Sequence, residues 1–165
     1  MNTLTQPLRD EHKELIPHIE RIREVADGIP ELPLDEIREG VKDVYEFLAY
    51  HLIPHAQAED AALYPVVGKV LGSPEATRTM KRDHVEVGRY VEELADLKEG
   101  LSADDFKTLQ RVLYGVYALV KVHFAKEEEV YLPILEERLT PESATEMFEA
   151  MEAAAHEAKH AAHSH

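Results

Sequence analysis

The sequence contains no cysteine and no tryptophan, and it is poor in basic residues, with 18 Lys and Arg against 33 Asp and Glu and a formal net charge of −15. The absence of cysteine excludes disulfides, thiolate zinc sites, iron–sulfur clusters and a cysteine nucleophile. The acidic balance argues against nucleic acid as a partner, because phosphate binding needs a basic face.

Long hydrophobic runs are also missing. No stretch approaches the ~18 uninterrupted apolar residues of a membrane span. The first residues carry acids early and have no apolar run, so they do not resemble a secretory signal or a basic transit peptide. We therefore expect a cytoplasmic protein with neither a membrane nor a nucleic acid as its partner, and the sequence indicates no particular protein partner.

Histidine, by contrast, is abundant, with 10 residues in a chain of 165. The composition, 44% hydrophobic and 31% charged, is typical of a folded globular chain. The length suits one domain with a proper hydrophobic core. The positions of the histidines relative to the apolar pattern are therefore the main guide to function.

Glycine, proline and serine divide the chain into five segments, with breaks at residues 27–33, 72–75, 100–105 and 140–142. Within the first four segments apolar residues recur at spacings of three and four, which is typical of amphipathic helices. Short loops between four such helices predict an all-α fold, an antiparallel up-down-up-down four-helix bundle over residues 1–139. Residues 140–165 are expected to form an additional C-terminal helix and His-rich tail of the same domain. Three prolines should kink or end the long helices: Pro54, Pro65 and Pro133.

Polar residues interrupt the apolar stripe of every long segment. Burying a lone imidazole requires a hydrogen-bond partner, and burying a bare carboxylate costs several kcal/mol more. Metal ions compensate both kinds of group, since imidazole nitrogen and carboxylate oxygen suit iron, zinc or manganese. The candidate metal ligands are four histidines and the two glutamates one helical turn after two of them: His12, His55, Glu59, His84, His123 and Glu127.

These candidate ligands belong to an internal repeat. Each His-x-x-x-Glu pair presents both of its side chains on one helix face, because residues four apart are neighbours on a helix. Two helix pairs, each contributing one single histidine and one such pair, would form a pseudo-twofold site for two metals. The repeated segments are 8–12 with 80–84, at an offset of 72, and 55–60 with 123–128, at an offset of 68.

This pattern resembles the hemerythrin HHE cation-binding family over roughly residues 8 to 137. The resemblance implies a four-helix bundle around a non-haem diiron centre, two Fe ions with an oxo or hydroxo bridge. His12 and His84 match the family's single histidines. His55 with Glu59, and His123 with Glu127, match its paired motifs, with the glutamates as bridges. Side-chain chemistry alone leaves zinc or manganese open.

The chain departs from the oxygen-carrying members of that family at Gly88, where they have a second histidine one turn after the first. Either one iron keeps an additional open position or another side chain fills it. His51, one turn before His55 on the inner stripe, is the best candidate, and His18, which lies off the face of His12, is a poorer one. Oxygen carriers also place the last carboxylate five residues after the histidine, where this chain has Glu128, but Glu127 is preferred because Glu59 mirrors it.

The other acids, tyrosines and histidines of the chain are not expected to be the main metal ligands. Acids beside the ligands are candidates to accept hydrogen bonds from the ring N–H groups: Asp10, Glu11, Asp60, Asp83 and Glu128. The tyrosines are expected to be core or rim aromatics, although a phenol near Gly88 could serve as a ligand or hydrogen-bond donor: Tyr50, Tyr64, Tyr90, Tyr114, Tyr117 and Tyr131. A separate group of histidines on the last helix and tail is expected to be solvated: His156, His160, His163 and His165.

The resemblance, together with the change at Gly88, implies three candidate functions. The leading one is a diiron protein that binds or senses dioxygen or a related small oxidant, such as peroxide or nitric oxide. The second is a diiron enzyme for peroxide or nitric oxide detoxification, because the position left by Gly88 could favour turnover. The third is a metal-responsive regulatory or iron-handling module, in which the last helix contacts a partner.

Overall fold

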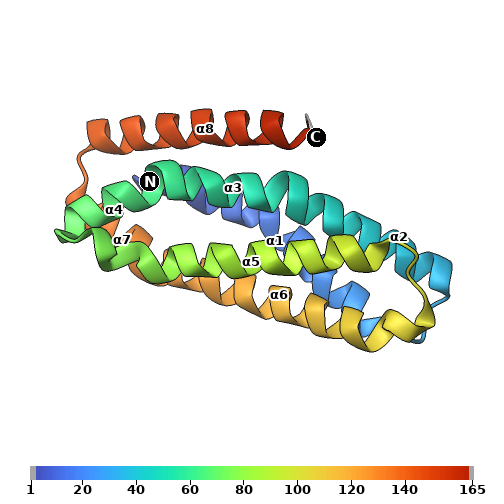
Figure 1. Cartoon of the computed structure of the whole chain (residues 1–165). Coiled ribbons are helices and arrows are strands. Elements are labelled where there is room, and N and C mark those ends of the chain that lie inside the picture. Colours follow the sequence, from blue (N-terminus) through green and yellow to red (C-terminus); the bar gives the residue numbers. More distant parts are fainter. Residues whose placement is uncertain (1–2, 164–165) are drawn as a thin grey trace.

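The computed structural model describes residues 3–163, and every regular element in that range is a helix (Figure 1). The first run is α1 (Gln6–Asp27), and the second joins α2 (Leu34–Phe47), α3 (Ile53–Ala58) and α4 (Tyr64–Leu71) through the π-helical turns η1 (Leu48–Leu52) and η2 (Glu59–Leu63). The third run contains the 3₁₀ turn η3 (Pro74–Thr77) and α5 (Arg78–Lys98). The fourth contains the 3₁₀ turn η4 (Ala103–Asp105), α6 (Phe106–Lys126), the π turn η5 (Glu127–Tyr131) and α7 (Leu132–Arg138), and α8 (Pro141–His163) follows.

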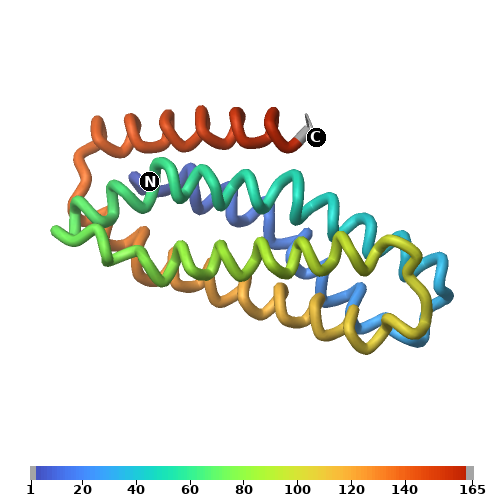
Figure 2. The backbone as a smooth tube through the Cα atoms, viewed as in Figure 1, coloured from blue at the N-terminus to red at the C-terminus, as the bar shows by residue number. Residues whose placement is uncertain are grey.

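The four runs lie side by side as a helical bundle, and the backbone traverses the bundle in alternating directions (Figure 2). Helix α1 packs on α6 and α2, and α5 packs on α6 and α2. Helix α8 lies outside this bundle along α3 and η2 (Figure 1). The helical fold class predicted from the sequence is thus confirmed, and none of the helices described is long and apolar enough to cross a membrane.

The predicted breaks are real helix ends. Gly72 has a φ of 72°, in the left-handed region that ends a helix without steric cost only for glycine. Ser102 and Asp105 form the reciprocal capping box that their spacing predicts. The hydroxyl of Thr140 accepts a hydrogen bond from the backbone N–H of Ser143, at 3.1 Å, at the start of α8.

The prolines inside the long runs do not end them. Each π turn is followed closely by one of the three prolines, Pro54, Pro65 and Pro133. Proline has no N–H to donate, and its ring crowds the carbonyl four residues earlier, so the backbone widens locally into a π turn and then continues. Two of these turns begin with the candidate ligands Glu59 and Glu127.

The apolar core consists of two clusters with the polar layer between them. Along α1, for example, Leu8 belongs to one cluster and Ile19 to the other, with His12 between them. Met80 and Val87 flank His84 on α5 in the same way. Each helix therefore buries apolar residues on both sides of the histidine level, which holds the polar layer at one depth of the bundle.

Candidate metal centre

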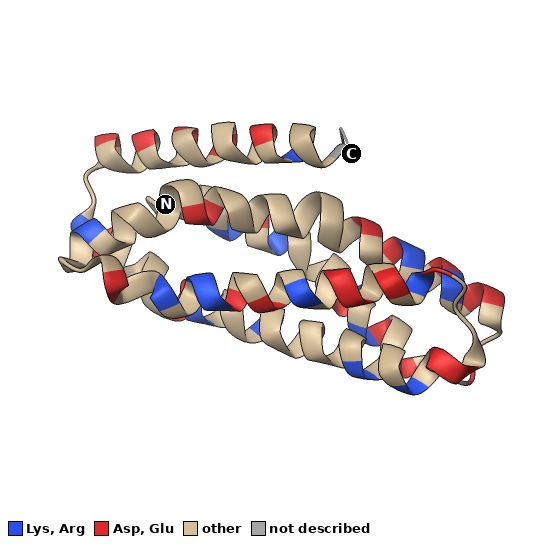
Figure 3. Ribbon diagram, viewed as in Figure 1, with Lys and Arg blue, Asp and Glu red and all other residues tan. Residues whose placement is uncertain are grey.

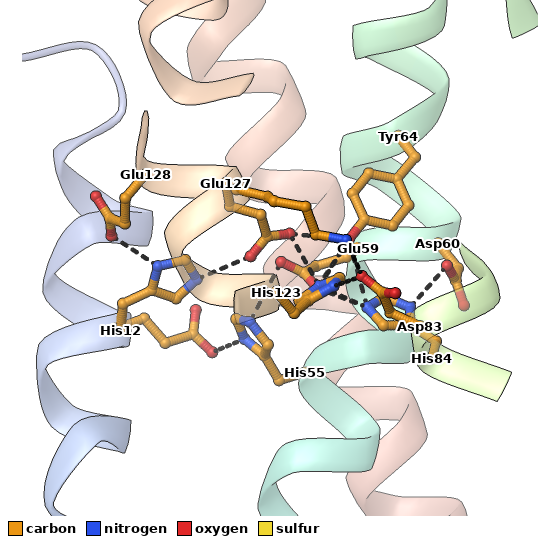
Figure 4. A network of polar contacts seen from close by, with 12 residues as sticks. His12, His55, Glu59, Asp60, Tyr64, Asp83, His84, His123, Glu127 and Glu128 are labelled. Carbon is orange, nitrogen blue, oxygen red and sulfur yellow. Dashed lines mark hydrogen bonds and ion pairs between the residues drawn. The ribbon is translucent and has the colours of Figure 1, made fainter. Parts of the chain in front are cut away.

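The structure brings the six candidate ligands together in one buried layer (Figure 4). Five of the side chains are buried, and His84 is nearly so. They come from all four runs of the bundle, so no single helix contains the site. The elements that carry them are α1, α3, η2, α5, α6 and η5.

The first ligand group consists of His12, His55, Glu59 and Glu127, and one ligand atom of each lies within 4.8 Å of the others. The Nε2 of His12 lies 3.2 Å from a carboxylate oxygen of Glu127, and the Nε2 of His55 lies 3.3 Å from one of Glu59. None of these four atoms makes a hydrogen bond within the described chain. Buried polar atoms are rarely left unpaired, because burial without a partner costs about 1–3 kcal/mol each. The donor set therefore fits a metal ion.

The second ligand group consists of Glu59, His84 and His123. The Oε1 of Glu59 lies 3.1 Å from the Nε2 of His84 and 3.5 Å from that of His123. The Oε2 of Glu127 also lies 3.5 Å from the Nε2 of His123. Each glutamate thus presents one oxygen to each group, which is the placement that two bridging carboxylates require.

Tyr64 adds a phenol to the second ligand group. Its hydroxyl oxygen lies 2.8 Å from Glu127, 3.0 Å from the Nε2 of His123, and 3.3 Å from both His84 and Glu59. The side chain is almost completely buried. From the sequence alone, Tyr64 is expected to be one of the core or rim aromatics. The internal repeat could have distinguished Tyr64 from the other tyrosines. Its counterpart at an offset of 68 is the apolar residue Leu132, so the hydroxyl of Tyr64 stands where the other half of the repeat has no polar group.

The position vacated at Gly88 remains open, because a Cβ built there would meet no atom within 4 Å. Gly88 itself contributes no ligand from this turn of α5. Tyr64 brings an additional oxygen to the same group of ligands from the junction of η2 and α4.

A carboxylate pairs with the outer ring nitrogen of each of the four histidines (Figure 4). We call these four acids the outer carboxylates: Glu11, Asp60, Asp83 and Glu128. The Nδ1–H of His12 donates to Glu128 at 2.7 Å, that of His55 to Glu11 at 2.8 Å, that of His84 to Asp60 at 2.9 Å and that of His123 to Asp83 at 2.9 Å. These bonds direct the Nε2 atoms at the ligand groups and increase their basicity.

The outer carboxylates follow a sequence rule. The acid immediately before a single histidine bonds the paired histidine of the neighbouring helix, as Glu11 does with His55. The acid immediately after a candidate bridging glutamate bonds a single histidine, as Asp60 does with His84. Asp10 is the exception among the acids predicted for this role, because its carboxylate accepts from the side chain of Gln6 at 2.7 Å.

Two of the outer carboxylates also pair with cations. Arg9 contacts Glu128, and the Nζ of Lys126 lies 2.6 Å from Asp83. The repeat does not relate the two pairs, since Arg9 corresponds to Lys81 and Lys126 to Ala58, but one pair lies beside each ligand group. They fix the carboxylates that in turn orient His12 and His123.

The metal-free centre binds protons tightly. Burial alone would lower the pKa of His123, but hydrogen bonds to Glu127 and Glu59 outweigh it and raise this pKa to about 10. Burial opposes the charged form of His55 too, yet the carboxylates of Glu59 and Glu11 keep its pKa well above the ordinary value. Protonated imidazoles therefore neutralise the buried carboxylates until a metal replaces the protons.

The structure does not bring His51 and His18 to the centre. His51 is exposed on η1, and the expectation that it lies on the inner stripe is wrong. The wider π turn moves a residue one α-helical turn before His55 off the inner face. Both histidines flank Phe47 in a surface groove, with ring centroids 5.0 Å (His18) and 6.5 Å (His51) from that of Phe47.

The structure also places the remaining candidate residues either inside or outside the ligand groups. Glu127 lies inside the first ligand group, whereas Glu128 and Asp60 lie outside both groups as outer carboxylates. On α8, His156 and His160 are exposed. The side chain of His163 and the whole of His165 lie outside the described residues.

Comparison with known families agrees with the geometry. The family model described as "Hemerythrin HHE cation binding domain" matches residues 3–135, which include all six candidate ligands. Searches of curated proteins and of solved structures gave no match. The match covers most of the chain, and the chain therefore belongs to the hemerythrin HHE cation-binding domain family.

Proposed function

We propose that this protein is a non-haem diiron protein that binds or senses dioxygen or a related small oxidant. The observation that carries the proposal is the pair of ligand groups that share Glu59, with four buried ligand atoms left without hydrogen bonds in the first group. Two iron ions held there would supply electrons and an open coordination position to a small oxidant.

Each of the two ligand groups would hold one iron ion. His12 and His55 would be the terminal ligands of one ion, and His84 and His123 those of the other, with Glu59 and Glu127 between them. Tyr64 would be a third terminal ligand in the second group, because its oxygen lies within 3.3 Å of His84, of His123 and of one oxygen of each glutamate. A phenolate oxygen is a hard donor that suits iron(III).

A small, mostly apolar cavity beside the candidate metal ligands supports the proposal that the bound oxidant is a small molecule. It offers about 10 Å³ and is lined by ligand groups and by Leu52, Ala56, Val87, Val120 and Phe124. That volume holds about one water molecule, so a diatomic ligand fits with little adjustment and a bulky organic peroxide does not. The apolar lining also keeps bulk water from the ligands.

A second, larger cavity connects solvent to the first ligand group. A groove of about 730 Å³ runs between α8 and the bundle and reaches Glu11 and His55. Small molecules that enter there would meet the first ligand group through its outer carboxylate.

The proposal is tested with ferrous-loaded protein prepared without air. Dioxygen, hydrogen peroxide and nitric oxide are added in separate titrations, and the optical spectrum is recorded. We expect a stoichiometric change with at least one of them, lost in His55→Ala and kept in His51→Ala. An unchanged spectrum with all three, in protein shown to hold iron, contradicts the proposal.

Enzymatic turnover of peroxide or nitric oxide is the second candidate function, and Tyr64 favours it. A buried phenol beside the ligands can hold a proton, and burial together with the nearby Glu59 and Glu127 raises its pKa. Reduction of peroxide consumes protons, so a donor at this place would assist it. Multiple turnovers of peroxide, slowed in Tyr64→Phe with iron content unchanged, would distinguish this function from simple binding.

A further inference from the structure

The stretch of α6 from residue 112 to residue 125 is mostly apolar, yet one of its faces is open to solvent. Residues 112–125 contain a single charged side chain, Lys121. A helix that is apolar all round is usually buried on every side. On α6, however, Tyr114 is 40% and Val122 is 57% exposed.

In the other half of the repeat, the residues equivalent to the open face of α6 are covered. At an offset of 68, Val122 and Val130 correspond to Pro54 and Ala62, which are both buried. Ala62 packs in the cluster of Met147 and Met151, because α8 lies over that side of the bundle. Val130, its counterpart, is 47% exposed. Figure 1 shows α8 along α3 and no such covering helix along α6, on the opposite side of the bundle.

The open face of α6 has a symmetric layout about Ala118. Tyr114 and Val122 lie four residues before and after Ala118. Arg111 and Ala125 lie seven residues before and after it. Eleven residues away stand a cation and an anion, Lys107 and Glu129. The six positions from Lys107 to Ala125 share one stripe of α6, Glu129 follows them in η5, and all seven are exposed. We call this stripe the α6 face.

The charges of the α6 face indicate its occupant. On a chain with a net charge of −15, most contacts between two copies would be repulsive, but the middle of α6 carries little charge (Figure 3). If two copies pack with their α6 helices antiparallel, Lys107 lies opposite Glu129 of the partner subunit. In the described chain, neither of these side chains has an ion pair of its own.

We propose that the α6 face is the interface of a twofold symmetric homodimer, with Ala118 on the axis. Ala118 is small enough to let the two helices approach closely, and Tyr114 packs against Val122 of the partner subunit. Two Lys107–Glu129 pairs, about 33 Å apart along the helix, close the ends. Exposed Ile16 on α1 and Val85 on α5 flank the helix that makes the contact.

A single helix pair buries less than the usual stable interface, so we expect a reversible dimer with a micromolar Kd. Sedimentation equilibrium of the full chain over a concentration series measures it. Ala118→Glu, which brings two like charges together on the axis, should leave only monomer. Leu32→Glu, at an exposed apolar residue in the loop between α1 and α2, is the matched control and should dimerise as the wild type does.

Charge reversal tests the antiparallel arrangement. Lys107→Glu and Glu129→Lys should each raise the dimer Kd about tenfold, and the double variant should restore it, because both pairs re-form with their charges exchanged. Since the chain has no cysteine, Ala118→Cys should also give a disulfide-linked dimer under mild oxidation, and Leu32→Cys should not. A wild type that remains monomeric at hundreds of micromolar, a dimer unaffected by Ala118→Glu, or a double variant that fails to recover would overturn the proposal.

Discussion

The phenol oxygen of Tyr64 lies 3.0 Å from the Nε2 of His123, inside the second ligand group. The two residues come from different runs of the bundle and are 59 positions apart in the sequence. Their proximity makes the two ligand groups chemically unequal, since the first group has only imidazole and carboxylate donors.

Replacement of Tyr64 by phenylalanine tests this inequality. We expect the iron(III) form of the wild type to show a visible phenolate-to-iron charge-transfer band, and Tyr64→Phe to lose it while it still binds two irons. Resonance Raman spectra excited in the band should show phenolate vibrations. Tyr131→Phe is the control, because the hydroxyl of Tyr131 donates to the backbone carbonyl of Ala76 and not to a ligand. A band that persists in Tyr64→Phe would contradict ligation by Tyr64.

Metal stoichiometry should follow the two ligand groups. His12→Ala removes a ligand of the first group only and His84→Ala one of the second only, so each variant should bind about one ion per chain. Glu59→Ala should bind least, because both groups use this carboxylate. Elemental analysis after loading and desalting measures the content. Equal losses in all three variants would show that the two groups do not bind independently.

The outer carboxylates should determine affinity without binding the metal. Glu11→Gln keeps the size of the side chain but removes the charge beside His55, and we expect metal affinity to fall about 10-fold or more. Competition with a chromophoric chelator measures the change. Asp10→Asn is the matched control, because Asp10 is adjacent in sequence but pairs with Gln6. A comparable loss in both variants would mean that general surface charge, and not the bond to His55, sets the affinity.

The stability of the metal-free protein should fall at alkaline pH. The pKa of His123 is about 10 in the fold against an ordinary 6.5, so its stabilising contribution is complete below about pH 6.5 and is lost as the pH rises through 10. Glu59 affects the acidic end of the pH range. Because its pKa is lowered well below 4.5 in the fold, the stability that its charged form contributes is lost as the pH falls below 4.5.

Urea unfolding at about pH 6 and about pH 9 measures this dependence. We expect the metal-free protein to have the lower free energy of unfolding at the higher pH. The metal-loaded protein should not follow it, because metal has already replaced the protons. Metal-free protein that is equally stable at both values would contradict proton binding by the centre.

Much of the centre could be predicted from the sequence, because the ligands replace apolar residues at a helical spacing. His12, His55, His84 and His123 interrupt stripes that the rest of each helix defines, and the structure places all four at one level. The acids next to the ligands were predicted as hydrogen-bond partners, and four of the five take that role.

The two errors have different physical origins. A regular spacing of 3.6 residues per turn predicts His51 on the inner face, but the π turn η1 changes that spacing just before Pro54. Tyr64 was not singled out, because a tyrosine on a core face is normally a packing residue. Only the repeat, which aligns Tyr64 with the buried Leu132, shows a hydroxyl at an otherwise apolar position.

Iron analysis of ferrous-loaded protein, before and after exposure to air, tests the diiron proposal most directly. We predict close to two irons per chain, and after oxidation the charge-transfer bands of a bridged iron(III) pair. Protein that binds one iron or none under these conditions, or that holds two irons without showing those bands, would contradict it.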